Sequence, residues 1–268
     1  MTIKKKKIYS LKKKFNIIFH LAVDIEVGLL SKKKRKKIFK KNDLINKNII
    51  NWWEKYNPEA KFISIGTSAS YSNNITKSEE FYLRGKPQRD WTQYAYSKRK
   101  MQKRLIKCSK KGLKFLTLVP CSIYGPGNYN NNKKKHFIAD IISKILFAKK
   151  NKSQPILYGD GLQERDIIFI DDFINIILKL CLKIDNLIIN VSNGKSHTIK
   201  FYTRFICKLV KFDFKKVIFN KIKSYGVKKS KLEISLLKKK LIKYKFTSFR
   251  KGLNETILCI KKEINCNI

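Results

Sequence analysis

Short apolar runs alternate along the chain with longer segments in which apolar residues recur every three to four positions. The short runs predict buried parallel strands, and the longer segments predict helices that cover them. The predicted strands are 16–23, 61–66, 113–120, 155–159, the first part of 165–180, and 186–194. The predicted helices are 36–56, 94–111, 136–150, the second part of 165–180, 198–211 and 249–263. This alternation is typical of an α/β protein with a parallel sheet.

The sequence changes character after Pro120, where the turn-rich stretch CSIYGPGNYNNN (121–132) follows a predicted strand. We therefore expect two parts. Residues 1–125 are expected to form part of a Rossmann-like nucleotide-binding fold. Residues 126–268 are expected to form a smaller α/β part that binds substrate and contains returning elements of the first part.

Basic residues dominate the charge, with 62 Lys and Arg against 19 Asp and Glu and a formal net charge of +43. Such an excess can indicate nucleic-acid binding. Only eight of these residues are arginine, however, and the lysine-rich runs 4–7, 32–37 and 133–135 are scattered along the chain. We interpret most of them as solvated surface and expect no specific nucleic-acid site. Non-specific adhesion to polyanions is expected at low salt.

The six cysteines form no C-x-x-C pair and show no spacing to histidine that is typical of zinc sites. We expect free thiols in a reducing compartment and no metal site. No apolar run approaches the roughly 18 residues that a membrane span needs. The basic N-terminal stretch is not followed by the apolar region of a signal peptide. We therefore expect a cytoplasmic protein without a membrane partner.

Four short motifs occur in the order GTSASY (66–71), YAYSK (94–98), SIYGPG (122–127) and GDGLQERDIIFIDD (159–172). In this order they resemble the NAD-dependent epimerase/dehydratases of the extended short-chain dehydrogenase/reductase superfamily, and within it the GDP-L-fucose synthases. The resemblance runs from FHLAV (19–23) to the last predicted helix. It implies NAD or NADP as cofactor, a nucleotide sugar as substrate, and a homodimer.

Tyr94 and Lys98 are four residues apart, which places both on one face of a helix. A free tyrosine titrates near 10, so proton exchange with a sugar hydroxyl needs a stabilised phenolate, and the Lys98 cation would lower the pKa of Tyr94. The resemblance implies that Tyr94 is the catalytic acid/base, with Lys98 as its support and Thr67 as the hydroxyl that orients the reacting oxygen. Without the other motifs, this pair would be interpreted as an ordinary helix-surface pair.

The resemblance also implies a set of cofactor-binding residues at the ends of two predicted strands and on the helix of the YAYSK motif. These are His20, Leu21, Ala22, Tyr94, Lys98, Pro120, Ser122 and Ile123. Small residues in HLAV (20–23) would permit close approach of the dinucleotide, and 120–123 would wrap the nicotinamide. A buried strand end is the alternative interpretation of 20–23, and both can hold together.

His136 lies 16 residues after Pro120, where the resemblance implies the acid of an epimerisation step. It could equally be a surface residue beside a lysine run. In the fucose synthases the partner of this acid is a cysteine, which is replaced here by Ala69. Because alanine cannot abstract a proton, the epimerisation half of the activity lacks one of its two groups.

For the nucleotide sugar, the resemblance implies Arg165, whose planar guanidinium suits anionic oxygens, with Tyr158 and Lys144 as further contacts. Asp171 and Asp172 are interpreted as caps of the following helix.

The family opens with a strand, a G-x-x-G-x-x-G turn and a helix that receive the dinucleotide. This sequence contains no such turn and begins about where the family's fourth strand does. We therefore expect a Rossmann-like sheet truncated at its N-terminus and an enzyme impaired as a stand-alone chain. The alternative function is a non-catalytic remnant that binds a nucleotide sugar or a polyanion. Polyanion binding would fall steeply with salt.

Overall fold

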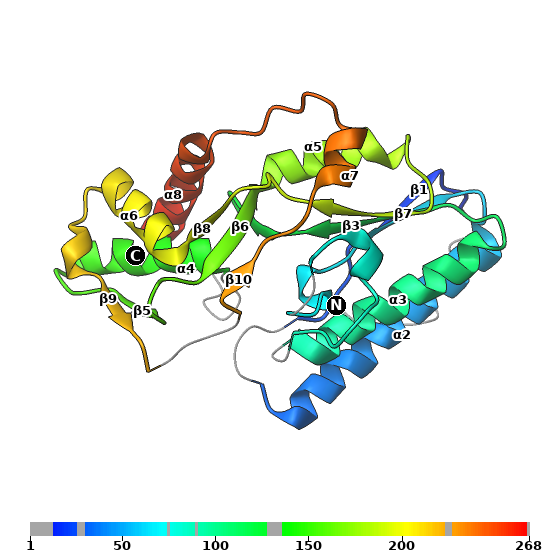
Figure 1. Ribbon diagram of the computed structural model, residues 1–268, viewed down its shortest axis with the longest axis horizontal. Coiled ribbons are helices and arrows are strands. Elements are labelled where there is room, and N and C mark those ends of the chain that lie inside the picture. Colours follow the sequence, from blue (N-terminus) through cyan, green and yellow to red (C-terminus); the bar gives the residue numbers. More distant parts are fainter. Residues whose placement is uncertain are drawn as a thin grey trace. The chain divides into compact units, whose positions relative to one another are not determined.

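The computed structural model describes residues 13–25, 30–73, 76–88, 91–127, 136–222 and 227–266. The chain divides into two compact units (Figure 1). Unit 1 contains Met1–Pro120, Asn175–Val191 and Glu233–Ile242, and unit 2 contains Cys121–Ile174, Ser192–Leu232 and Lys243–Ile268. The expected boundary near residue 125 stays a prediction, because compactness does not establish which part binds substrate.

Unit 1 is built on a four-stranded parallel sheet in the order β1-β2-β3-β7. The strands are β1 (Ile17–His20), β2 (Lys61–Ile65), β3 (Phe115–Pro120) and β7 (Leu187–Val191). In register, Ile18 lies opposite Phe62, and Phe62 lies opposite Phe115. Since all neighbouring strands run parallel, their carboxyl ends meet at one edge of the sheet, where ligands bind in folds of this type.

Two long helices, α2 (Lys32–Tyr56) and α3 (Thr92–Ser109), lie side by side in unit 1 (Figure 1). Their inner faces pack with β2 and β3 into one apolar cluster. It includes Ile50, Trp52, Trp53, Phe62, Met101, Leu105 and Phe115. The Trp53 indole N–H donates to the Ala60 carbonyl at 2.7 Å, so this buried aromatic side chain has its polar atom satisfied. The short elements of unit 1 are η1 (Ser68–Ser70), η2 (Glu79–Phe81) and α7 (Ser235–Lys240).

Unit 2 contains two smaller sheets. In the first, β6 (Glu164–Phe169) pairs in parallel with β4 (Ser122–Tyr124) and β10 (Lys229–Ser230), and antiparallel with β8 (Ser196–Thr198). In the second, β5 (Ile156–Tyr158) pairs with β9 (Ile218–Asn220). The helices are α4 (Phe137–Lys150), α6 (Ile199–Val210), α8 (Phe249–Cys266) and the short η5 (Phe214–Lys216). Their apolar cluster includes Ile142, Ile145, Phe169, Tyr202, Ile206 and Leu253. α5 (Ile170–Cys181) directly follows β6, and its residues are divided between the two units.

The predicted α/β class with a parallel sheet is confirmed, and every predicted strand and helix occurs with shifted ends. β1 ends at His20, before the end of the predicted strand 16–23, and the chain just beyond is held by a side chain of α2. The Asp24 N–H donates to Asn42 Oδ1 at 2.7 Å, and Asn42 Nδ2 donates to the Asp24 carbonyl at 2.8 Å. The predicted loop 121–132 contains β4, which only its pairing with β6 defines. The lysine runs 4–7 and 133–135 lie outside the described residues.

The capping interpretation of Asp171 and Asp172 is wrong. α5 begins at Ile170, so both aspartates lie inside its first turn. The Asp172 carboxylate instead accepts hydrogen bonds from the Thr247 N–H at 2.9 Å and from its hydroxyl at 3.1 Å. Asp172 therefore ties the segment before α8 to α5.

In the described part of the chain, no helix combines the length and apolar character needed to cross a bilayer.

Candidate functional site

The three predicted catalytic residues of the hydride-transfer step all lie in unit 1. Thr67 follows β2 at the carboxyl edge of the sheet, and Tyr94 and Lys98 lie one turn apart near the start of α3. Lys98 Nζ lies 5.9 Å from the centroid of the Tyr94 ring. The Thr67 hydroxyl accepts from the Ala69 N–H at 3.3 Å, and no described hydrogen bond joins it to Tyr94. The structure thus pairs Tyr94 with Lys98 and places Thr67 on a separate loop.

Burial controls the charges of this site. It lowers the pKa of Lys98 from 10.5 to about 8. It also raises the pKa of Tyr94 above its ordinary value of 10, with a further rise from Tyr82. The expected lowering of the Tyr94 pKa by Lys98 is therefore wrong for this arrangement, because desolvation of the phenol is the larger effect. At neutral pH, Tyr94 carries its proton and Lys98 is mostly charged.

His20 ends β1 and is linked to the first turns of α3 through Asn46 of α2. His20 Nε2 lies 2.8 Å from Asn46 Oδ1, and because an amide oxygen only accepts, Nε2 carries the proton. Asn46 Nδ2 donates to the Ser97 carbonyl at 3.5 Å, and the Ser97 hydroxyl donates to the Tyr94 carbonyl at 2.7 Å. Burial and the Lys98 charge lower the pKa of His20 to about 4, so this imidazole is neutral at pH 7.

Asn46 was missed by sequence reasoning, although a signal for it exists. On α2 the buried positions include Ile38, Asn42, Asn46 and Ile50, which recur every four residues. Two amides in the middle of an otherwise apolar stripe are unusual, because a buried amide costs free energy unless it is hydrogen-bonded. Both bind the chain at the end of β1. Polar residues on the predicted buried face of this helix could have indicated that it contacts the end of β1.

Several contacts hold the loop that carries Thr67. The Thr67 N–H donates to the Tyr82 hydroxyl at 3.2 Å, and the Gln88 N–H donates to the Ala69 carbonyl at 3.2 Å. Gly66 immediately precedes this loop. A Cβ atom at position 66 would lie only 2.7 Å from Val119 Cγ2. No larger residue fits there without movement, so the exit from β2 is fixed by close packing.

Arg99, next to Lys98 on α3, clamps the same loop. Its guanidinium donates to the carbonyl of Ser70, to that of Arg84 at 2.6 Å and to that of Gly85 at 2.7 Å. Arg99 is 5% exposed, and no carboxylate in the described part of the chain pairs with it. Backbone carbonyl oxygens thus bind the two terminal nitrogens of a buried cation, which fixes the loop relative to α3, while its Nε has no partner in the described residues.

We expect Arg99→Lys to lower the free energy of unfolding by about 2 kcal/mol, because a single ammonium group cannot replace the planar fork and leaves a buried carbonyl without a donor. Urea unfolding followed by circular dichroism measures this. Arg104→Lys is the matched control, since Arg104 lies on the same helix and pairs with Asp43 through partly exposed side chains. Equal losses in both variants would contradict the clamp.

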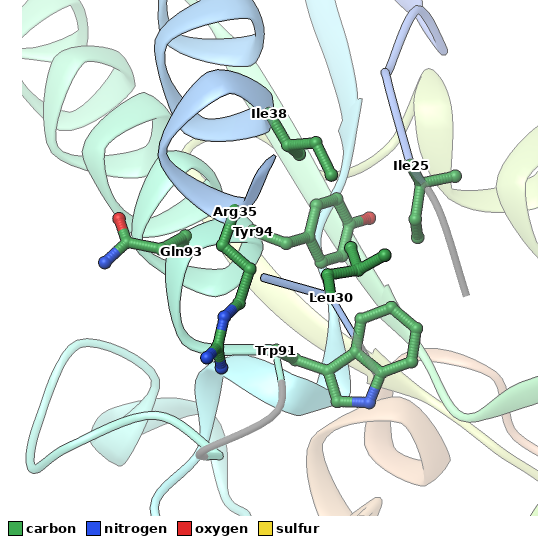
Figure 2. Close-up of a pocket in the computed structure, with 7 residues that line it drawn as sticks. All are labelled: Ile25, Leu30, Arg35, Ile38, Trp91, Gln93 and Tyr94. Carbon is green, nitrogen blue, oxygen red and sulfur yellow. The ribbon is translucent and has the colours of Figure 1, made fainter. Parts of the chain in front are cut away.

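An open cavity of about 290 Å³ lies beside Tyr94 (Figure 2). Apolar, aromatic and polar side chains line it: Ile25, Leu30, Arg35, Ile38, Trp91, Gln93 and Tyr94. Figure 2 shows the Tyr94 ring among Leu30, Ile38 and Trp91, with its hydroxyl directed towards Ile25. This volume includes space that is open to solvent, and the enclosed part of the cavity is small.

The predicted cofactor residues beyond α3 differ in burial. His20 is 4% exposed, whereas Leu21 is 62% exposed and Ala22 is also exposed, so only the first residue of HLAV is a buried strand end. Pro120 ends β3 in unit 1, and Ser122 and Ile123 begin β4 in unit 2.

The predicted substrate residues lie in unit 2. Lys144 Nζ lies 4.9 Å from the centroid of the Tyr158 ring and 2.7 Å from the Asp140 carboxylate, so the structure brings Lys144 and Tyr158 together. Arg165 donates to the backbone carbonyls of Glu164 at 2.7 Å and Val227 at 2.8 Å.

His136 is an exposed residue immediately before α4. Its side chain makes no capping hydrogen bond to the helix. Its position is therefore that of a surface residue, and the epimerisation role stays a prediction.

Comparisons with known proteins show the family that the chain resembles. The model of the NAD dependent epimerase/dehydratase family matches residues 4–192. GDP-L-colitose synthase of Yersinia pseudotuberculosis is 24% identical over 184 residues, which cover 66% of this chain but only 59% of that protein. GDP-L-fucose synthase of Dictyostelium discoideum is 26% identical over 246 residues, or 89% of this chain and 76% of that protein.

The fold is also that of a solved structure. GDP-L-fucose synthetase from Naegleria fowleri bound to NADP superposes with a TM-score of 0.83 and 19% sequence identity, covering 97% of this chain and 80% of that chain. At this identity the likeness concerns the fold, and the chemistry rests on the residues of the site.

Proposed function

The chain belongs to the NAD dependent epimerase/dehydratase family, and from this premise we propose that it reduces a keto group, at C4, of a nucleotide-linked sugar with NAD(P)H. The observation that carries the proposal is the pairing of Tyr94 with the buried cation Lys98 near the carboxyl edge of a parallel sheet. The names of the relatives support a GDP-linked deoxysugar as the substrate class.

Tyr94 is in the protonation state that reduction requires. When hydride adds to the carbonyl carbon, the electron pair of the C=O bond moves to oxygen, and that oxygen takes the proton of the Tyr94 hydroxyl. Lys98 then lies close to the phenolate that remains and stabilises it electrostatically. The Thr67 hydroxyl oxygen already accepts a hydrogen bond from the Ala69 N–H. Its proton stays available, and Thr67 would donate it to the same substrate oxygen.

The residues at this edge fit the nicotinamide half of a dinucleotide. A bound NAD(P)H supplies the hydride. Lys98 is a buried cation that has no described carboxylate partner, and Leu21 and Ala22, which follow His20 at the end of β1, are exposed apolar residues. We propose that His20, Leu21, Ala22, Lys98 and Pro120 hold this half, with Ser122 and Ile123 from β4.

Epimerisation is not part of the proposed activity. Ala69 lies in η1, two residues after Thr67, where a methyl group cannot remove a proton from a sugar carbon. His136 would be left as an acid without a base.

In unit 2, the proposed contacts to the nucleotide sugar are Arg165, Tyr158 and Lys144. The Lys144 ammonium would have to exchange its ion pair with Asp140 for one with the ligand.

The test is to mix the purified chain with NADPH or NADH and a GDP-linked 4-keto-6-deoxysugar, with dTDP- and UDP-linked 4-ketosugars for comparison. Loss of the reduced-nicotinamide absorbance, together with formation of the reduced sugar in mass spectrometry, is expected. A folded chain that binds no cofactor and no sugar nucleotide would contradict the proposal. Binding that ignores the sugar and falls steeply with salt would favour the polyanion-binding alternative instead.

A further inference from the structure

Aromatic side chains from three elements of unit 2 form a cluster that the proposed reduction does not use. His197 of β8 stacks on Phe201 of α6, with ring centroids 4.2 Å apart and an interplanar angle of 17°. Phe249 begins α8, and its ring lies 6.4 Å from that of Phe201 at 24° and 5.0 Å from that of Phe205. Both helices pack on α4 (Figure 1). We call these four residues the aromatic platform.

The platform has an accessible face, which Phe201 provides. Phe201 is 41% exposed, whereas the next residue, Tyr202, is 1% exposed and belongs to the core of unit 2. Phe205 and Phe249 are partly buried against the same core. A single exposed apolar side chain is ordinary on a protein surface. An exposed ring that three other rings hold in place is different, because it presents a flat face in a fixed orientation.

His197 adds a further neutral ring to the platform. Burial and the Lys195 charge lower the pKa of His197, so its imidazole is mostly uncharged at pH 7. Glu164, the carboxylate that acts on this imidazole, is already engaged by other groups. It lies 3.2 Å from Lys229 Nζ and accepts from the Ser196 hydroxyl at 3.1 Å. The platform is therefore aromatic and apolar at neutral pH.

Exposed cations adjoin every member of the platform within two residues in sequence. They are Lys195, Lys200, Arg204, Arg250 and Lys251. None of them forms an ion pair in the part of the chain that the structure describes, and neither α6 nor α8 has an acidic residue in its first turn. Lysine is common over the whole surface, but two of the eight arginines of the chain lie here. Guanidinium groups suit both phosphates and aromatic faces.

We propose that the aromatic platform and its cations bind single-stranded nucleic acid without sequence preference, with a base stacked on Phe201 and phosphates paired with the flanking cations. Every base has a flat π-face that can extend the ring stack, and the backbone phosphates match exposed Lys and Arg side chains. A second copy of the chain fits poorly on this surface, because each copy carries a formal net charge of +43.

This inference goes beyond the proposed reduction and does not depend on it. Stacking and phosphate contacts do not distinguish one base from another, which agrees with the expectation that the chain has no specific nucleic-acid site. The rings give a defined position to the polyanion adhesion that the basic composition predicts.

The test separates stacking from charge with two labelled oligomers. One is a thymidine oligomer of about 12 nucleotides, within the range of site sizes for single-strand surfaces, and the other is an abasic oligomer with the same number of phosphates. Fluorescence anisotropy measures their binding to the full chain at fixed ionic strength. Wild type should bind the thymidine oligomer several-fold more tightly than the abasic one.

Phe201→Ala should weaken binding of the thymidine oligomer about tenfold, as expected for one lost base–aromatic stack, and should leave the abasic oligomer unchanged. Phe201→Trp keeps a stacking ring and should keep the affinity. Phe147→Ala is the matched control, because Phe147 is 66% exposed in the same unit and lies close to Lys149 and Lys150. It should bind both oligomers as wild type does.

The charge contribution has its own measurement. Lys200→Gln should reduce the slope of log affinity against log salt by about 0.7 for both oligomers, the value for one phosphate contact on a single strand. Equal affinity of wild type for the two oligomers, no effect of Phe201→Ala, or an equal loss for both oligomers in that variant would overturn the proposal. The same holds if Phe147→Ala weakens binding as much, or if polyglutamate of matched charge binds as tightly as the thymidine oligomer.

Discussion

Tyr94→Phe is expected to reduce the turnover of a nucleotide-linked 4-ketosugar by about a thousandfold, within the range that a positioned proton donor contributes. Phenylalanine keeps the ring that packs beside Trp91 and removes only the hydroxyl. In the described residues this hydroxyl has no hydrogen-bond partner, so its loss leaves no buried group unsatisfied. The variant should therefore fold normally and bind cofactor and sugar, with the loss in kcat rather than in KM.

Steady-state kinetics and urea unfolding of the same preparations check this result. Tyr96→Phe is the matched control, because Tyr96 lies two residues further on α3 with its side chain 39% exposed. Its kinetics and stability should match those of wild type. Equal turnover in Tyr94→Phe and wild type would remove Tyr94 from the mechanism. A loss of kcat that follows a loss of folded protein would show a structural role.

The sequence could predict the elements of unit 1 because their signals are local. The strands around Phe62 and Phe115 are short apolar runs, and the Tyr94–Lys98 pair is a spacing on one helix. These features depend on the period of a strand or helix and not on distant contacts. The position of Thr67 after β2 also follows from the chain order.

Other features depend on contacts between residues far apart in sequence, and local patterns could not show them. His20 of β1 contacts Asn46 of α2, which is 26 residues away in sequence. Arg99 of α3 contacts Ser70 in the loop after β2, which is 29 residues away. The effect of burial on Tyr94 is of the same kind. A spacing rule predicted a lowered pKa, whereas the three-dimensional surroundings remove water from the phenol and raise it.

Lys98→Met is expected to stabilise the protein while it destroys activity. Lys98 is 4% exposed, and burial lowers its pKa from 10.5 to about 8. The unfolded chain thus holds the Lys98 proton more tightly than the folded chain does, so keeping this charge in the fold costs free energy below pH 8. The shift corresponds to about 3 kcal/mol. Methionine fills similar space without the charge, and turnover should fall about a hundredfold because the Tyr94 phenolate loses its cation.

The sign of the pH dependence identifies the cause of this stabilisation. Between pH 8 and pH 10.5 the folded wild type has released the Lys98 proton while the unfolded chain still holds it. Wild type therefore gains stability relative to Lys98→Met as pH rises through this range, and the difference between the two should be much smaller at pH 10 than at pH 7. Unfolding of both proteins at pH 7 and pH 10 measures this, and other titrating groups cancel because both share them. Lys100→Met, which removes an exposed cation paired with Asp43, should change stability by less than about 1 kcal/mol at either pH. A Lys98→Met difference that is independent of pH would show that packing, and not the buried charge, sets the stability of this site.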